Sequence, residues 1–175
     1  MPPSRKYWEI LLSLAYIDPT VARYVHSSYS EHIHVERSKV IDFDHCSKTV
    51  WYSINKKYAS MSGSKQYDVA FSVYDEIRDI IASISERAGV EHASFGTKCS
   101  ALETMRKIGK TSCLSSGDTL AHEVQKQASH DTSFVDGMFE VVDAMSDAEC
   151  EKMCAVHDGR STFLDKMEEL AGACG

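Results

Sequence analysis

An amphipathic stretch from Gln66 to Arg87 sets the class of fold, because its apolar residues recur every three or four positions. The stripe consists of Ala70, Val73, Ile77, Ile80 and Ile84. This spacing places the side chains on one face of an α-helix, while the acids and arginines of the stretch lie off that face. Tyr74 and Ile81 widen the face beyond the two-position seam of a coiled coil. We therefore expect a bundle helix with several neighbours.

The rest of the chain also favours helices. Proline occurs only at positions 2, 3 and 19, so nothing after that prevents long helices. Asp18 followed by Pro19 has the pattern of a helix start, a capping carboxylate before a proline at the first helical position. No stretch of four or more residues alternates well enough to predict a strand. The sequence predicts an all-α fold, a compact multi-helix bundle of about seven to nine helices in a single helical domain over 1–175.

A long helical hairpin is expected at the centre of this bundle. Between Thr20 and Met61 there is neither glycine nor proline, but one helix of that length would span about 60 Å, too long for a compact domain of this size. We expect a break at the serine-rich cluster 27–30, because serine side chains compete with the helical backbone for hydrogen bonds. Beyond it, the apolar pattern predicts a helix over about 33–60 that pairs with the helix over about 66–87.

Capping signals divide the second half of the chain into shorter helices. The residues from 90 to 98 are expected to form a connection, followed by a helix over 100–110 with Leu102, Met105 and Ile108 inward. Ser146 and Glu149 have the spacing of a capping box. Further helices are predicted over Thr119 to about Ala128, from about Asp131, from Ser146 to about Val156, and from Ser161 onwards.

The charge balance argues against a nucleic-acid or anionic-lipid partner. The chain is acidic, with 19 basic and 26 acidic residues and a formal net charge of −7, so the whole protein has no electrostatic attraction to a polyanion. One basic stretch, Lys98, Arg106, Lys107 and Lys110, keeps nucleic-acid binding as a third hypothesis. The acidic region 131–158 is interpreted as a solvated surface, and a docking face for a basic partner is the alternative.

The sequence predicts a protein that stays inside the cell, in the cytoplasm or nucleus, with no membrane partner. No apolar run approaches the roughly 18 residues of a membrane-spanning helix, and the stretch from Tyr7 to Tyr16 is too short and interrupted for a signal peptide. The six cysteines are therefore expected to be reduced thiols. The sequence has no Cys-x-x-Cys pair, which argues against a thioredoxin-like redox site and the usual zinc knuckles.

A cluster of histidines and carboxylates at 26–46 has the ligand types that zinc, iron or manganese prefer. Within it we single out His32, His34 and Glu36, because His32 and Glu36 are four residues apart and would share one helical face. A di-iron bundle would need a second pair of ligands from another helix, and the later chain offers only adjacent Glu-His pairs that point apart. The main interpretation is surface histidines at a polar start of a helix, with a metal site as the alternative.

A second candidate metal cluster consists of Cys150, Cys154 and His157, which would point to one side of a helix. Thiolate and imidazole ligands together favour zinc, and Cys174 or another histidine could supply a fourth ligand. Cysteine is also a small, frequently buried residue, so the same face could simply pack inward. Zinc is the only cofactor that this pattern suggests, and the main expectation is no cofactor.

Motifs for catalysis and nucleotide binding are missing from the sequence. It contains no Gly-x-Ser-x-Gly pattern and no glycine-rich phosphate loop. Gly109-Lys110-Thr111 lacks the upstream glycine of a Walker motif and falls at the end of a predicted helix, not after a strand. No catalytic residue is predicted, and we expect a binding function in preference to an enzymatic one.

The leading hypothesis is a non-enzymatic helical protein-protein interaction or scaffold domain that binds another protein or itself. Tyr7 and Trp8 are the candidate contact residues, in a first helix that is apolar nearly all round. Such a helix is expected to be buried, and to become a docking surface if the fold around it is incomplete in the isolated chain. The alternative hypothesis is a metal-binding (Zn or Fe) helical protein or enzyme that uses one of the two polar clusters.

Overall fold

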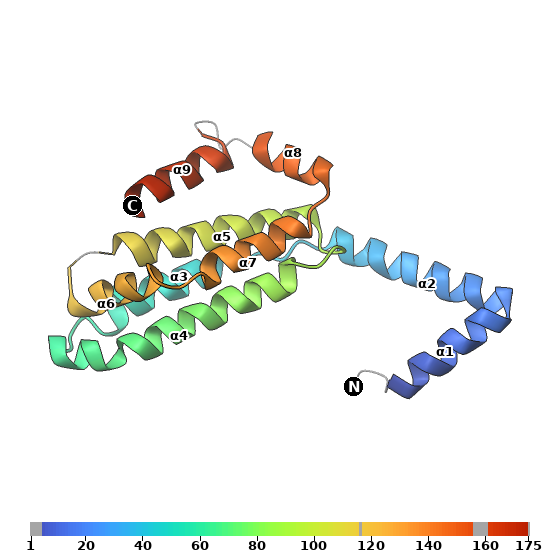
Figure 1. The fold of residues 1–175 in the computed structure, drawn as a ribbon, viewed down its shortest axis with the longest axis horizontal. Coiled ribbons are helices and arrows are strands. Elements are labelled where there is room, and N and C mark those ends of the chain that lie inside the picture. The colour runs from blue at the N-terminus through green and yellow to red at the C-terminus, as the bar shows by residue number, and fades with distance from the viewer. Residues whose placement is uncertain (1–4, 116, 156–160, 175) are drawn as a thin grey trace. The chain divides into compact units, whose positions relative to one another are not determined.

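A computed structural model describes residues 5–115, 117–155 and 161–174, and all regular secondary structure in these ranges is helical (Figure 1). The predicted all-α class is confirmed. In chain order the elements are α1 (Arg5–Ile17), α2 (Pro19–Ser38), α3 (Asp44–Tyr52), a π-helical turn η1 (Ser53–Lys57), α4 (Gly63–Ala88), α5 (Phe95–Leu114), α6 (Thr119–Ala128), α7 (Ser133–Asp143), α8 (Asp147–Ala155) and α9 (Phe163–Cys174).

The chain divides into two compact units. Residues 1–39 form the first unit, in which α1 and α2 pack on each other, and we call it the N-terminal helix pair. Residues 40–175 form the second unit, which contains α3 to α9 and which we call the helical bundle. The single domain over 1–175 stays a prediction.

α4 is the central helix of the bundle, as its apolar stripe predicts. It packs most extensively on α6 and α7, and it also contacts α5. Four of the five predicted stripe residues are at most 2 % exposed: Ala70, Val73, Ile77 and Ile84. The fifth, Ile80, is half-buried, and its neighbour Ile81 joins Tyr74 in the core. The wide apolar face therefore has several neighbours, as expected.

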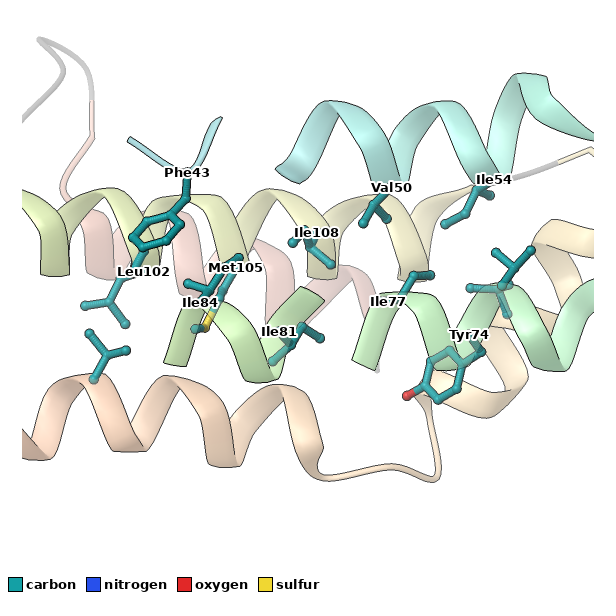
Figure 2. Packing of buried hydrophobic residues seen from close by; sticks show 14 of the residues in the cluster. Phe43, Val50, Ile54, Tyr74, Ile77, Ile81, Ile84, Leu102, Met105 and Ile108 are labelled. Atoms are coloured by element: carbon teal, nitrogen blue, oxygen red, sulfur yellow. The ribbon is translucent and has the colours of Figure 1, made fainter. Parts of the chain in front are cut away.

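α5 supplies the opposite side of the core. Its residues Leu102, Met105 and Ile108 are buried as predicted, and Figure 2 shows them close to the isoleucines of α4. The helix is longer than the predicted 100–110 segment and starts at Phe95. Ser94 caps it, because its side-chain oxygen accepts the N–H of Thr97 at 3.1 Å.

The predicted break at the serine-rich cluster 27–30 is wrong. α2 continues through these exposed residues and ends only before the connection to α3. In that connection the N–H of Ile41 donates to Thr97 Oγ1 (2.9 Å), and the N–H of Phe43 donates to Ser100 Oγ (3.0 Å). The Phe43 side chain is fully buried. These contacts with α5, which is distant in sequence, therefore determine where α2 ends. The helix penalty of the serines at 27–30 is too small to interrupt α2.

The predicted pairing of a helix over 33–60 with one over 66–87 is also wrong in detail. The first of these helices is divided among the end of α2, α3 and η1, and α3 packs mainly on α5. Figure 2 shows Val50 and Ile54 directed from α3 and η1 towards α5. α4 instead packs on α6 and α7, so the bundle is built around α4 and α5, with α3 and α9 both packed on α5.

Three predicted helix starts are confirmed by their hydrogen bonds. The Asp18 carboxylate accepts the N–H two residues further on at 2.8 Å, with proline at the first position of α2. The Asp118 carboxylate accepts an N–H of the first turn of α6 at 2.9 Å. Ser146 and Glu149 form the capping box: the N–H of Ser146 donates to Glu149 Oε2 (3.0 Å), and the N–H of Glu149 donates to Ser146 Oγ (3.3 Å).

α7 approaches α4 closely at Gly137. A Cβ added at this glycine would lie 2.6 Å from Ser85 Oγ and 2.9 Å from Ile81 Cγ2. Ser85 Oγ itself lies 3.1 Å from the carbonyl oxygens of Ile81 and Gly137, so it is held in place between the two helices. Glycine costs stability inside a helix, and here it permits two backbones to approach.

Replacing Gly137 by alanine is expected to lower the free energy of unfolding by about 1–3 kcal/mol, because the added methyl group overpacks the contact between α4 and α7. Gly172→Ala is the matched control. Gly172 also lies in a helix, where an added Cβ would meet nothing within 4 Å, so this variant gains up to about 1 kcal/mol of helix propensity. Urea unfolding measures both, and equal stability of the two variants would contradict the close approach.

Candidate functional site

The N-terminal helix pair exposes large apolar side chains on α1. Six of them are between 49 % and 94 % exposed, and we call this set the α1 apolar surface: Tyr7, Ile10, Leu12, Leu14, Tyr16 and Ile17. None of the described side chains of α1 or α2 is buried. The expectation of a buried first helix is therefore wrong. Tyr7 belongs to the exposed set, and the Trp8 side chain lies outside the part of the chain that the structure describes.

The α1 apolar surface has the spacing of a helix-pairing seam. Tyr7, Ile10, Leu14 and Ile17 are three, four and three residues apart, as in the a and d positions of a coiled coil. α2 packs on α1, but Ile10 and Leu14 are each 49 % exposed, and Tyr7 and Ile17 are more exposed still. Much of the seam therefore stays uncovered among the described residues of this unit.

The net charge of the helix pair is close to zero. Of the 19 basic and 26 acidic residues in the chain, residues 1–39 contain five basic and four acidic ones. Residues 40–175 therefore contain 14 basic and 22 acidic ones, a formal charge of −8. Two copies of the helix pair can approach each other without net repulsion, whereas two bundles repel each other.

The first predicted metal cluster is not brought together by the structure. His32 and His34 are two residues apart on α2, so they point to opposite sides of that helix, and both are exposed. The Glu36 carboxylate is paired with the ammonium group of Lys39. Within the described ranges, no three histidine, cysteine or acidic side chains are arranged to hold a metal ion. The metal site at His32, His34 and Glu36 stays a prediction without geometric support.

The second predicted metal cluster is only partly described. Cys150 is half-buried and Cys154 is exposed, both on α8, and His157 lies outside the described residues. The inward side chain of α8 is Met153, whose sulfur lies 3.4 Å from Cys99 Sγ. Inward packing therefore does not account for Cys154, and the zinc alternative at this cluster stays a prediction.

The basic stretch that kept nucleic-acid binding as a hypothesis forms no free basic surface. Lys98 is 1 % exposed, and the other three cations each face an acid. The pairs are Lys98–Glu149, Arg106–Glu103, Lys107–Asp44 and Lys110–Glu169. These ion pairs remove the observation that favoured a polyanionic partner. The sequence did not reveal the pairing, because three of the four acids, Asp44, Glu149 and Glu169, lie more than 50 residues from their cations.

The buried Lys98 ties α5 to the junction of α7 and α8. Its Nζ donates to the carbonyl oxygen of Ala144 at 2.7 Å and lies 3.1 Å from Glu149 Oε2. Burial raises the pKa of Glu149, but the N–H of Ser146 and the Lys98 ammonium together lower it by more. The pKa of Glu149 is therefore below its usual value. The carboxylate that closes the capping box thus also neutralises the buried lysine.

A cavity of about 600 Å³ lies in the helical bundle between α4, α5, α6, α7 and α9. Its walls are mainly apolar and include Ile77, Ile81, Ile108, Phe134 and Leu170. Polar residues of α6 and of the last turn of α5 line one part of it. A volume of this size lies in the range of small-molecule sites, roughly 300–1,000 Å³. The sequence did not reveal this cavity, because its lining comes from five helices.

Gly109 helps to form the cavity wall. A Cβ added there would lie 2.6 Å from Phe134 Cζ, so the phenylalanine ring lies directly over the backbone of α5. This contact places the start of α7 against α5. Gly109-Lys110-Thr111 is thus an internal segment of α5 and not a phosphate loop, as its position in a predicted helix indicated, and the glycine serves packing.

The titratable groups beside the cavity, Tyr74, Asp131 and Lys126, differ in the partners that they have. Burial and the adjacent Asp131 carboxylate raise the pKa of Tyr74 to about 12, so the phenol stays protonated. The N–H of Ser133 lowers the pKa of Asp131, which also lies 3.1 Å from Arg78 Nε. Lys126 lines the cavity as well, and within the described ranges it makes no ion pair. Lys126 is therefore a cation of the lining that no described acid neutralises.

No known protein family, curated protein or solved structure matches this chain. Among the described residues, no helix combines the length and the apolar character that crossing a membrane requires. The α1 apolar surface and the cavity are thus the features from which a function can be argued.

Replacing Glu149 by glutamine is expected to lower the free energy of unfolding at pH 7 by about 2 kcal/mol, because the buried Lys98 ammonium loses its counter-charge. Glu169→Gln is the matched control, since the Lys110–Glu169 pair is 3.7 Å apart and largely exposed. It should change stability by no more than about 0.5 kcal/mol. Urea denaturation compares the two, and equal effects would contradict the role of the buried pair.

The stability difference between wild type and Glu149→Gln is expected to depend on pH. The folded pKa of Glu149 lies below its ordinary value of 4.5, so the ion pair contributes fully above that value and is lost as the pH falls through the folded pKa. The difference should therefore be constant near neutral pH and shrink below pH 4.5. Urea titrations across this range measure it, and a difference that persists unchanged in acid would contradict the assignment.

Proposed function

We propose that this chain is a non-enzymatic helical interaction domain that self-associates through its N-terminal helix pair. The observation that carries the proposal is the α1 apolar surface, which stands exposed on a unit without any buried side chain among those described. The lack of a Gly-x-Ser-x-Gly pattern and of a glycine-rich phosphate loop in the sequence supports the non-enzymatic part of the proposal.

The energetics of the helix pair favour a partner. Short helices gain most of their stability from tertiary packing, and α1 has only 13 residues. Covering one large apolar side chain contributes about 1.5–3 kcal/mol when the burial is complete. Even partial burial of the six residues of the α1 apolar surface therefore supplies several kcal/mol to an interface.

Three properties of the helix pair favour a second copy as the partner. The seam spacing suits packing against another helix, and the same seam is present on every copy, as a two-fold symmetric interface requires. The near-zero charge of residues 1–39 allows two copies to approach. The helices of 13 and 20 residues are about 20 and 30 Å long, enough for the roughly 800 Å² per partner of a standard interface.

Leu14→Glu is expected to weaken self-association by about 100-fold or more, because each protomer would bury an unpaired carboxylate in the seam. Ser13→Glu is the matched control, since it adds the same charge to the adjacent position outside the seam, where Ser13 Oγ donates only to a carbonyl of its own helix. Sedimentation equilibrium of the full chain measures the dimer dissociation constant of all three proteins.

The expected result is a wild-type dimer, a Ser13→Glu dimer of similar affinity and a Leu14→Glu monomer with unchanged helical circular dichroism. A wild-type chain that remains monomeric at about 100 µM, where even a weak specific dimer is populated, would contradict self-association. A dimer that Leu14→Glu leaves intact would place the interface elsewhere.

A further inference from the structure

The cavity of the helical bundle has one polar end, formed by α6 and the last turn of α5. The side-chain amide of Gln125 donates to the carbonyl oxygen of Cys113 at 2.9 Å and joins the two elements. Ser112 precedes Cys113 in the sequence and Lys126 follows Gln125, and both Ser112 and Lys126 line the cavity. Ser112 and Lys126 therefore belong to the two elements that this hydrogen bond joins, whereas the apolar residues of α4, α7 and α9 form other parts of the wall.

Ser112 carries a buried hydroxyl group that lacks a partner. The residue is 4 % exposed, and its Oγ makes no hydrogen bond within the described part of the chain. Most serines in the interior of a helix return a hydrogen bond to their own backbone or to a neighbouring side chain, and buried polar atoms are nearly always paired. The hydroxyl of this lining residue is therefore available to a polar ligand atom in the cavity once its side chain turns towards that atom.

The charge at the cavity favours an anionic ligand group. Asp131 is the acid of the lining, and its carboxylate is held by Arg78 and by the N–H of Ser133. Lys126 has no acid paired with it among the described residues, and His122 lies one turn before it on the same face of α6. A carboxylate can accept from both Lys126 and the Ser112 hydroxyl.

We propose that this cavity binds one amphipathic small molecule, a long-chain carboxylate. The hydrocarbon chain packs on the lining residues that keep accessible apolar surface, Phe134, Val135, Met167 and Leu170, and the carboxylate accepts hydrogen bonds from Lys126. The volume of about 600 Å³ suits an extended apolar chain better than a compact anion, which would leave the apolar wall uncovered. This site lies in the helical bundle and does not depend on self-association through the N-terminal helix pair.

Isothermal titration calorimetry of the full chain with dodecanoate, below its micelle concentration, tests the proposal. We expect saturable binding of one dodecanoate per chain. Butanoate lacks the long chain and dodecanol lacks the charge, so each should bind at least about tenfold more weakly. Undetectable saturable binding of dodecanoate, or equal affinity for dodecanol, would overturn the proposal.

Two polar variants test the carboxylate contacts. Lys126→Met should weaken dodecanoate binding roughly tenfold and leave dodecanol binding unchanged. Lys65→Met is the matched control, because Lys65 is exposed on α4 and does not line the cavity. Ser112→Ala should weaken dodecanoate binding severalfold without lowering the melting temperature of the ligand-free protein, since the removed hydroxyl has no partner there.

Two filling variants test whether the cavity is the site. Ala171→Trp on α9 and Val135→Trp on α7 place an indole at exposed positions that line the cavity, where a large side chain is tolerated. Both are expected to abolish dodecanoate binding while circular dichroism and the urea midpoint stay close to wild type. Wild-type affinity in both folded tryptophan variants would overturn the assignment of the ligand to this cavity.

Discussion

Burial of the wide apolar face of α4 is the constraint on which the helical bundle depends. Because Ile77 and Ile81 both point inward, one neighbouring helix cannot cover the face, and α5, α6 and α7 share it. α5 carries a buried face of its own and also receives α3 and α9. α4 and α5 each leave apolar sides that the other does not cover. The helices that pack on this pair, α3, α6, α7 and α9, take the positions in which they cover those sides.

Two glycines determine how α7 packs on this pair and, through it, where the cavity forms. Gly137 lets the backbone of α7 approach α4, while Gly109 accepts the Phe134 ring over α5. α7 is thus held at its first turn by one helix and near its middle by another. The space beside Phe134 is bounded mainly by helices, with Ser129 and Asp131 of the connection between α6 and α7, so most of its shape is set by the same packing that stabilises the core.

Periodicity and capping predicted the helical elements, but not the contacts between distant residues. α4 extends the predicted 66–87 segment by only a few residues, and α6 has the predicted bounds. The break at Phe43 was missed because it depends on the Ser100 hydroxyl of α5, and the burial of Lys98 was missed because it depends on Glu149. The cavity was missed for the same reason, because each lining residue has the pattern of an ordinary core or surface residue within its own segment.

The apolar side chains of the α1 apolar surface and those of the cavity wall form surfaces of different shape. On α1 they lie on the convex side of a helix, where only another extended apolar surface can cover them. In the bundle they line a concave space of about 600 Å³, which a small molecule can fill. The bundle carries a formal charge of −8, whereas residues 1–39 are close to neutral. We therefore propose different occupants for the two surfaces: an apolar helix for the convex one, and for the concave one a small molecule whose own charge is matched by Lys126.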